Sequence, residues 1–245
     1  MVELLDPVPG QRILELAAGP GETGFRTLAG LQPGGELLVT DFAPEMVAAA
    51  QRRAAALGLD SVTFGVEDMT ELSLPDQSFD GVLCRFGLML VPEMGHAADQ
   101  IARVLRRPGG KAVLAVWGSS ERNPWMTATG RAALGLGLVD PPDRDAPGPF
   151  RLSDPERLKS VVAAAGLEVT LLEETRVTWE AASIDEWWEA SCDMSPTLGM
   201  LLADLPADVV IELRLRAAGF LDEYLAADGS LTVPGLARIV VATTP

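Results

Sequence analysis

Three glycines placed directly after a short apolar run limit what this chain can fold into more than any other stretch. The run Ile13 to Ala17 leads into Gly19, Gly21 and Gly24, and a helical pattern follows. Glycine adopts backbone angles closed to other residues and has no side chain to keep a ligand off the main chain. A strand, a glycine-rich turn and a helix in this order are typical of α/β proteins that bind a nucleoside-bearing cofactor. The glycines alone do not identify that cofactor.

The order of the segments along the chain predicts the fold class. Apolar runs that resemble strands alternate with helical patterns, and a long helical stretch separates the last two runs. We therefore predict an α/β, Rossmann-like, doubly wound and mostly parallel sheet of seven strands, with a helical lid inserted between the last two. The predicted strands lie at 13–17, 36–41, 62–66, 81–84, 111–117, 167–178 and 237–243, and three early helices at 22–29, 44–57 and 92–105.

The whole chain, residues 1–245, is expected to form a single domain. Its cofactor-binding core is predicted at about 10–117 plus 153–180 and 230–245, and the segments at about 118–152 and 183–229 are expected to cover the substrate. Serine followed three residues later by glutamate predicts a capping box at the start of two helices. These capping boxes are Ser153 with Glu156 and Ser183 with Glu186.

Composition limits the partners and the cellular location. The formal net charge is -16, and no basic cluster exceeds Arg106-Arg107, so we expect no nucleic-acid partner. The two cysteines, Cys84 and Cys192, are far apart and lack a histidine-rich neighbourhood, which predicts neither a disulfide framework nor a metal site. No apolar run reaches the roughly 18 residues of a membrane span, and the acidic start does not resemble a signal peptide. The expected location is the cytoplasm, and the oligomeric state stays open.

Carboxylates near the ends of three predicted strands help to choose between cofactors. Glu15 lies within the strand before the glycines, Asp41 ends the second strand and Asp68 follows the third. The spacing from Gly19 to Asp41 is close to that at which a carboxylate reaches ribose hydroxyls. A dinucleotide site does not need all three acids, whereas the cationic amino-acid nucleoside S-adenosylmethionine can use several. An NAD-linked oxidoreductase stays an alternative, because the glycine pattern matches the dinucleotide fingerprint.

These motifs resemble those of the class I S-adenosylmethionine-dependent methyltransferases, over about residues 10 to 117. Within that class the similarity is greatest to the type 11 group, which includes the menaquinone/ubiquinone biosynthesis methyltransferases. The group's first motif is an acidic residue followed by three alternating glycines, and Glu15-Leu-Ala17-Ala-Gly19-Pro-Gly21 fits it with alanine in the first glycine position. The stretches Phe79 to Arg85 and Leu105 to Gly110 resemble two later motifs, the second lengthened by one arginine.

The resemblance implies S-adenosylmethionine as the cofactor and assigns its binding residues. The methionine part would lie against Glu15, Ala17, Gly19 and Gly21. The ribose and adenine side would lie against Asp41, Phe42 and Met46, and the adenine amino group and ring against Asp68 and Met69. The methyl donor would lie near Arg85. Arg85 could also orient an acceptor or pair with a carboxylate.

The implied reaction is methyl transfer to a small acceptor, which we expect to be apolar or aromatic. Trp125, Trp187 and Trp188 lie in the covering segments and either stack on that acceptor or form the core of the lid. No catalytic residue is predicted, because a general base is needed only where the acceptor must lose a proton. A non-catalytic S-adenosylmethionine-binding protein therefore stays a second alternative.

The sole histidine, His96, is expected to be exposed and structural. Glu189, Asp193 and Tyr224 are candidate proton acceptors on no ground other than their location. Related enzymes carry an N-terminal helical segment over the cofactor, but the first predicted strand here starts soon after Met1. Either the later insertions alone cover the cofactor or the sequence begins late.

Overall fold

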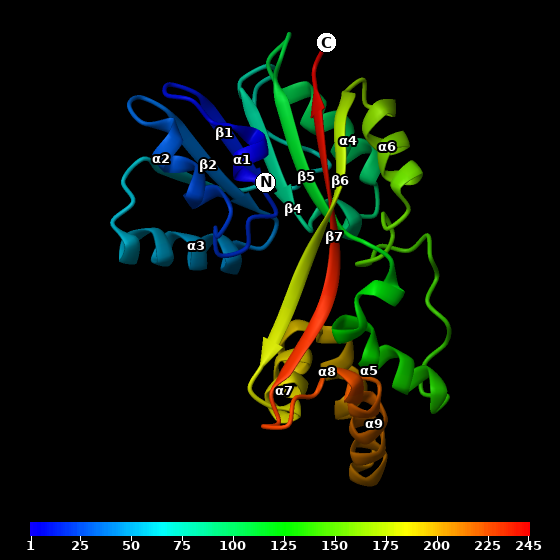
Figure 1. Ribbon diagram of the computed structural model, residues 1–245. Helices are drawn as coiled ribbons and strands as arrows, with labels where there is room; N and C mark the ends of the chain where they lie inside the picture. Colours follow the sequence, from blue (N-terminus) through cyan, green and yellow to red (C-terminus); the bar gives the residue numbers. More distant parts are fainter. The chain divides into compact units, whose positions relative to one another are not determined.

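Seven strands form one sheet in the computed structural model, which describes residues 1–245 (Figure 1). The sheet has the order β3-β2-β1-β4-β5-β7-β6, and the pairs among β1 to β5 are parallel. β7 runs antiparallel to β5, because Gly109 N bonds Thr244 O at one end and Gly118 N bonds Leu236 O at the other. The strands are β1 (Arg12–Leu16), β2 (Glu36–Asp41), β3 (Val62–Val66), β4 (Gly81–Arg85), β5 (Lys111–Trp117), β6 (Glu168–Ala181) and β7 (Leu231–Thr243).

Nine α-helices accompany the sheet. Three of them, α7 to α9, lie between the last two strands, β6 and β7, and α5 follows β5. The predicted doubly wound fold with a helical insertion is therefore confirmed. The helices are α1 (Val2–Leu5), α2 (Leu28–Leu31), α3 (Pro44–Leu57), α4 (Met94–Val104), α5 (Pro124–Gly135), α6 (Pro155–Ala164), α7 (Ile184–Met194), α8 (Pro196–Ala203) and α9 (Ala207–Gly219).

Alternate residues of the central strands pack into two separate hydrophobic cores, one on each face of the sheet. Leu14 and Leu16 of β1 pack with α4 and α6 on one face of the sheet. Ile13 of β1 and Leu37 of β2 pack with α1, α2 and α3 on the other face (Figure 1). Parallel strands covered on both faces need apolar residues at successive positions, which explains why the strands appear as continuous apolar runs.

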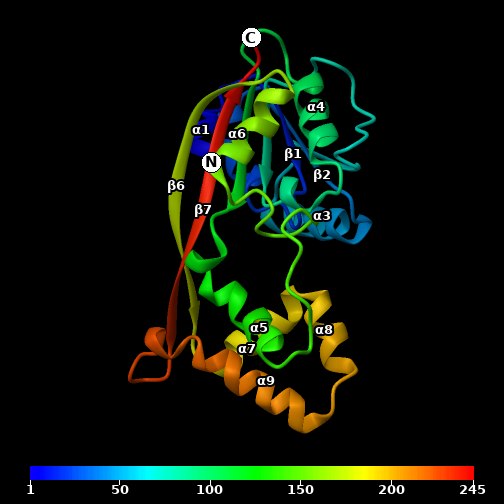
Figure 2. The same ribbon diagram turned by 90° about the vertical axis from the view of Figure 1, so that its right-hand side faces the viewer.

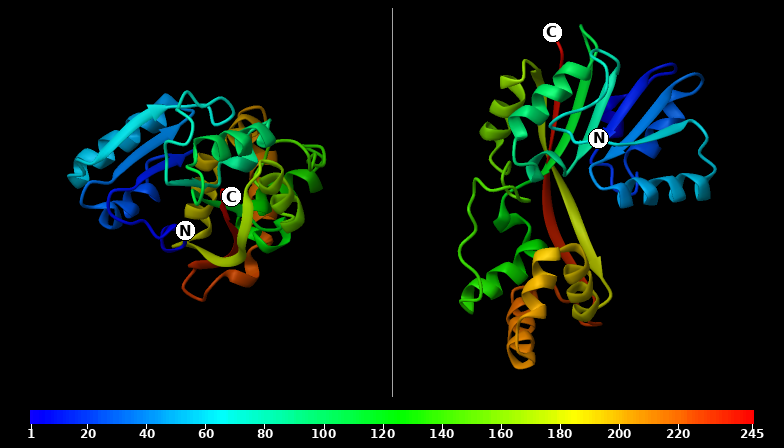
Figure 3. Two further views of the ribbon diagram at one scale, coloured as in Figure 1. Left: turned by 90° about the horizontal axis from the view of Figure 1, so that it is seen from above. Right: turned by 180° about the vertical axis from the view of Figure 1, so that it is seen from behind.

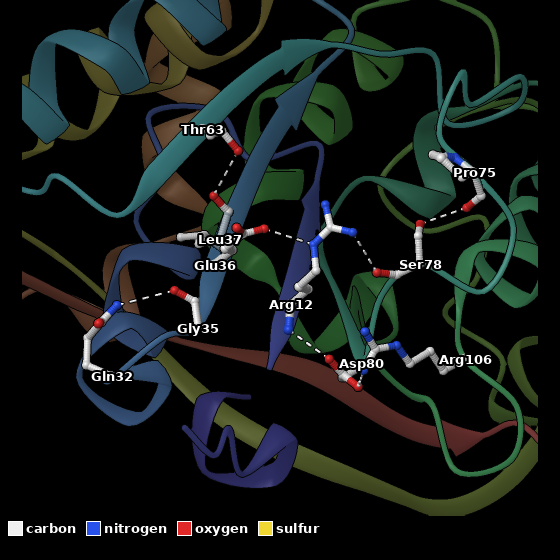
Figure 4. A network of polar contacts seen from close by, with 10 residues as sticks. All are labelled: Arg12, Gln32, Gly35, Glu36, Leu37, Thr63, Pro75, Ser78, Asp80 and Arg106. Carbon is white, nitrogen blue, oxygen red and sulfur yellow. Dashed lines mark hydrogen bonds and ion pairs between the residues drawn. The ribbon is translucent and has the colours of Figure 1, made fainter. Parts of the chain in front are cut away.

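A polar network joins the starts of β1, β2 and β4 (Figure 4). The backbone N of Arg12 donates to Asp80 Oδ2 at 2.8 Å, and its side-chain Nε donates to Glu36 Oε2 at 2.9 Å. Arg106 Nη1 reaches the other oxygen of Asp80 at 2.5 Å. Since the strands begin here, these charges fix the strand register at the edge opposite the glycine turn.

Two helix starts differ from the sequence-based prediction. The helix expected at 22–29 is instead a 3₁₀ turn, Gly24–Thr27, followed by α2, and the Gly24 N–H at the start of the turn donates to the Glu15 side chain. The capping box at Ser153 is wrong: Asp154 caps α6 by accepting from Glu156 N at 2.9 Å. Pro155 then occupies the first turn, where a missing N–H costs nothing. The Ser183 cap is confirmed, since its hydroxyl accepts from Glu186 N.

The chain divides into two compact units. The first comprises Met1–Trp117, Asp145–Glu174 and Arg238–Pro245, and the second comprises Gly118–Arg144 and Thr175–Ala237. β6 and β7 contribute to both units and lie side by side along their length (Figure 2). The prediction that residues 1–245 make one domain stays a prediction.

Within the second unit, helices α7 to α9 gather near the end of β6 and the start of β7 (Figure 3). The fully buried Asn123 precedes α5 and is hydrogen-bonded to β7. Its Oδ1 accepts from Leu236 N at 3.0 Å, and its Nδ2 donates to Leu236 O at 3.1 Å. No helix of either unit combines the length and the apolar character needed to cross a membrane.

Candidate functional site

The turn after β1 adopts backbone angles that favour glycine. Gly19 and Gly21 adopt positive φ angles of 54° and 80°, and a Cβ on Gly21 would lie 2.5 Å from the Phe25 ring. Ala17 also has a positive φ, 49°, which is uncommon for a residue with a side chain. The turn therefore exposes main chain at the carboxyl end of β1, where α/β sheets bind their ligands.

Glu15 is a buried carboxylate beneath this turn. Its side chain is 2% exposed, and Oε1 accepts a hydrogen bond from Gly24 N at 2.9 Å while Oε2 has no partner. Burial raises the pKa of Glu15 to about 7, against the lowering effects of the Gly24 N–H and the positive charge of Arg85. A bound cation would offset the desolvation of this carboxylate, so the site favours a positively charged ligand.

Asp41 ties the turn after β1 to the turn after β2. Its Oδ2 accepts from Gly19 N at 2.8 Å, and its Oδ1 accepts from Ala43 N at 3.0 Å. Neighbouring Thr40 donates its hydroxyl to Glu15 O at 2.8 Å. Asp41 thus lies at the predicted edge and positions the glycine turn, while its contact with a ribose stays a prediction.

The remaining predicted cofactor residues lie at the ends of β2 and β3. Phe42 is 73% exposed and Met46 is 45% exposed, so both side chains are accessible to a ligand. Asp68 Oδ1 accepts from both the backbone N and the hydroxyl of Thr70, and these bonds lower the pKa of Asp68. Met69 next to it is buried.

Arg85 ends β4 beside an open cavity of about 540 Å³. Its Nη2 lies 3.3 Å from Glu22 Oε2, and Arg53 pairs with the other oxygen of Glu22 at 3.2 Å. The hydrogen bond from Arg53 and the two positive charges lower the pKa of Glu22. Thr23 and Arg26 line the same cavity together with the start of α1. Arg85 therefore pairs with a carboxylate, that of Glu22, which was one of the roles that the sequence left open for it.

Two aromatic residues at the same edge were missed by the sequence reasoning. Phe86 follows β4 and Trp117 ends β5, and their rings stack with centroids 3.9 Å apart and planes 6° apart. Their positions at the carboxyl ends of neighbouring strands were a usable signal, because those ends share one edge of a parallel sheet.

The three tryptophans predicted to meet an acceptor are buried in the second unit. Trp187 is fully buried and donates its Nε1–H to Trp125 O at 3.1 Å, and Trp188 is also buried. This packing fits the alternative in which they form that unit's core, and an acceptor contact stays a prediction. His96 is exposed on α4, as are Glu189 and Asp193 on α7, and Tyr224 is half-buried.

Comparison with known proteins identifies similarity to one family. Residues 13–110 match the family described as methyltransferase domain. Demethylmenaquinone methyltransferase from Clavibacter sepedonicus is 42% identical over 108 residues, which cover 44% of this chain and 42% of that protein. The enzyme of the same name from Thermus thermophilus is 40% identical over 104 residues, covering 42% of this chain and 46% of that protein. The chain thus spans less than half the length of these relatives.

The fold as a whole resembles solved structures at low sequence identity. The crystal structure of the YcgJ protein from Bacillus subtilis superposes with a TM-score of 0.66 and 18% identity, covering 100% of this chain and 96% of that one. The likeness in fold therefore extends beyond residues 13–110.

Proposed function

We propose that the protein transfers a methyl group from S-adenosylmethionine to a small organic acceptor. The match of residues 13–110 to the methyltransferase domain family and the similarity of the same region to demethylmenaquinone methyltransferases support this proposal. The observation that carries this proposal is the Glu15 carboxylate, buried under the glycine turn with one oxygen unpartnered. S-adenosylmethionine carries a sulfonium and an ammonium, so it supplies the positive charge that this carboxylate lacks.

The residues at the sheet edge fit that cofactor. The glycine turn offers main-chain groups to the methionine part, and Asp41 with the exposed Phe42 and Met46 offers a polar and an apolar surface for the ribose and adenine. Asp68 is ionised and exposed, which suits an acceptor of hydrogen bonds from an amino group. These assignments are proposals that rest on geometry and charge.

When bound, the sulfonium supplies an activated methyl group with a good leaving group. The chain's own residues therefore need to position the acceptor and do not need to activate the methyl group. Methyl transfer is an in-line displacement, which is accelerated when acceptor and methyl are held within near-attack distance away from water. A general base adds to the rate only for acceptors that must lose a proton. We propose a small, apolar or aromatic acceptor, and no residue of the site is assigned as a base.

Binding of S-adenosylhomocysteine tests the cofactor assignment directly. Isothermal titration should give a single site on the wild-type chain, unaffected by NAD. Replacing the buried carboxylate by Glu15→Gln should weaken binding about tenfold or more, because a charge-assisted interaction is lost. Glu36→Gln is the matched control, since Glu36 is exposed at the opposite edge of the sheet. Binding of NAD in place of S-adenosylhomocysteine would overturn the proposal.

Turnover is tested with labelled S-adenosylmethionine and a panel of phenols, quinols and amines. Transfer of label to any of them supports an enzyme. Tight cofactor binding with no transfer to any class of acceptor would favour a protein that binds the cofactor without catalysis.

A further inference from the structure

Two stacked aromatic rings lie at the sheet edge of the candidate site, and no role proposed so far uses them. Phe86 and Trp117 stack almost parallel with their centroids 3.9 Å apart. Both residues are half-buried and pack against the hydrophobic core on one face of the sheet. Both belong to the first compact unit, as do all the predicted cofactor residues.

The backbone at Phe86 adopts a strained conformation. Its φ is 62°, a left-handed conformation that bulky residues rarely adopt. The backbone is held in place because Phe86 N donates to Ala115 O at 2.8 Å, and because a Cβ on Gly87 would lie 2.4 Å from the Cβ of Ala17. Strain of this kind persists where the surroundings enforce it, and it is concentrated at binding and active sites.

The charges next to the ring pair link it to the glycine turn. The Arg85 guanidinium lies 5.8 Å from the Phe86 ring centroid, and the same arginine interacts electrostatically with Glu15. β4 is the direct neighbour of β1, with Cys84 in register with Leu16. Phe86 therefore lies one strand away from the carboxylate that we assign to the cofactor, and Trp117, at the end of β5, lies two strands away.

We propose that Phe86 and Trp117 form a stacking platform for a planar aromatic acceptor, an inference that rests on the proposed function and narrows its acceptor class. Aromatic rings prefer offset or edge contacts with other rings, and a partly buried ring pair at the sheet edge suits a planar ligand that makes such contacts. In the reaction, an oxygen or nitrogen of the acceptor bonds to the methyl carbon while the carbon–sulfur bond breaks. The electron pair of that bond stays on sulfur, and the acceptor's proton passes to water.

A matched pair of ligands isolates stacking from ordinary burial. 2-Naphthol and its saturated counterpart, decahydro-2-naphthol, are titrated separately into the protein loaded with S-adenosylhomocysteine. The planar ligand should bind about two- to tenfold more tightly than the saturated one, the preference expected from ring stacking. Phe86→Leu and Trp117→Leu should abolish this preference and leave the affinity for S-adenosylhomocysteine unchanged.

Further variants guard against a change in folding. Phe64→Leu removes an aromatic ring of β3 that packs edge to face on Phe25, and it should keep the preference for the planar ligand. Trp117→Phe retains an aromatic ring and should keep most of the preference for the planar ligand. Equal affinity of the two ligands for the wild-type protein, or a preference that survives both leucine variants, would refute the platform. The ligands are also titrated into unloaded protein, so a failure to bind S-adenosylhomocysteine counts against the proposed function alone.

Discussion

Glu15 shows how one residue can link stability to binding. Its pKa of about 7 in the folded protein exceeds the 4.5 of an unperturbed glutamate, so the folded state takes up a proton more readily than the unfolded chain. The stabilisation that protonation brings is complete at low pH and is lost as pH rises from about 4.5 through about 7. A cationic ligand has the opposite preference, because it favours the ionised carboxylate.

The affinity for S-adenosylhomocysteine should therefore rise with pH. The ligand's ammonium is attracted by ionised Glu15, and below about pH 7 binding must first remove a proton from this carboxyl group. Between about pH 6 and about pH 8 the dissociation constant should fall about tenfold. Titration calorimetry across this range measures the change, and Glu15→Gln should flatten it. A slope that persists in the variant would assign the proton to another group.

Gly87 tests how tightly the turns after β1 and β4 are packed. Gly87→Ala would place a methyl group 2.4 Å from the Cβ of Ala17, so we expect a loss of about 1–3 kcal/mol in the free energy of unfolding. Gly95→Ala is the matched control, because nothing lies within 4 Å of its added Cβ and alanine is the better helix residue. Urea denaturation compares the two variants. Equal stability would show that the turns move apart at little cost.

At the scale of elements, the start of α6 shows where a sequence motif and local structure differ. Asp154 caps the helix and the Ser153 hydroxyl has no such bond, although both residues suit the role. Asp154→Ala should lower the free energy of unfolding by about 0.5–2 kcal/mol. Ser153→Ala should change it by less than about 0.5 kcal/mol. Chemical denaturation distinguishes them, and a larger effect of Ser153→Ala would restore the predicted capping box.

The places of the strands along the chain were predictable because their apolar runs are continuous and glycine, proline or carboxylate residues mark their ends. β6 and β7 were underestimated in length, since Ala181 and Leu231 lie beyond the segments that show a clear strand pattern. The places of Glu15 and Asp41 beside the glycine turn were predictable because a motif fixes them, while their contacts with a cofactor stay predictions. Phe86 was missed because its role depends on the neighbouring strand β5, and a single sequence does not report such contacts.

At the scale of the whole molecule, burial differs greatly between elements. Gly81 to Cys84 of β4 are all buried at the centre of the sheet, whereas in α8 only Leu198 is buried and Met200 is largely exposed. Elements with few buried contacts open at lower free energy than central strands.

Hydrogen exchange should follow this difference in burial. Amides of β4 should exchange most slowly, by global unfolding, and those of α8 should exchange faster, by local opening. Mass spectrometry of peptides covering the two elements measures both rates under the same native conditions. Equal protection would mean that α8 is held by contacts that its exposure does not reveal, such as a second molecule.

The second compact unit is built from two separate stretches of chain, because β6 and β7 run through both units. A chimera that exchanges this unit between homologues must therefore carry two cassettes, residues 118–144 and 175–237, and four junctions. Every residue assigned to the cofactor, together with Phe86 and Trp117, lies outside both cassettes. Recombination of this kind would vary the helical part of the protein while the same donor chemistry is inherited unchanged.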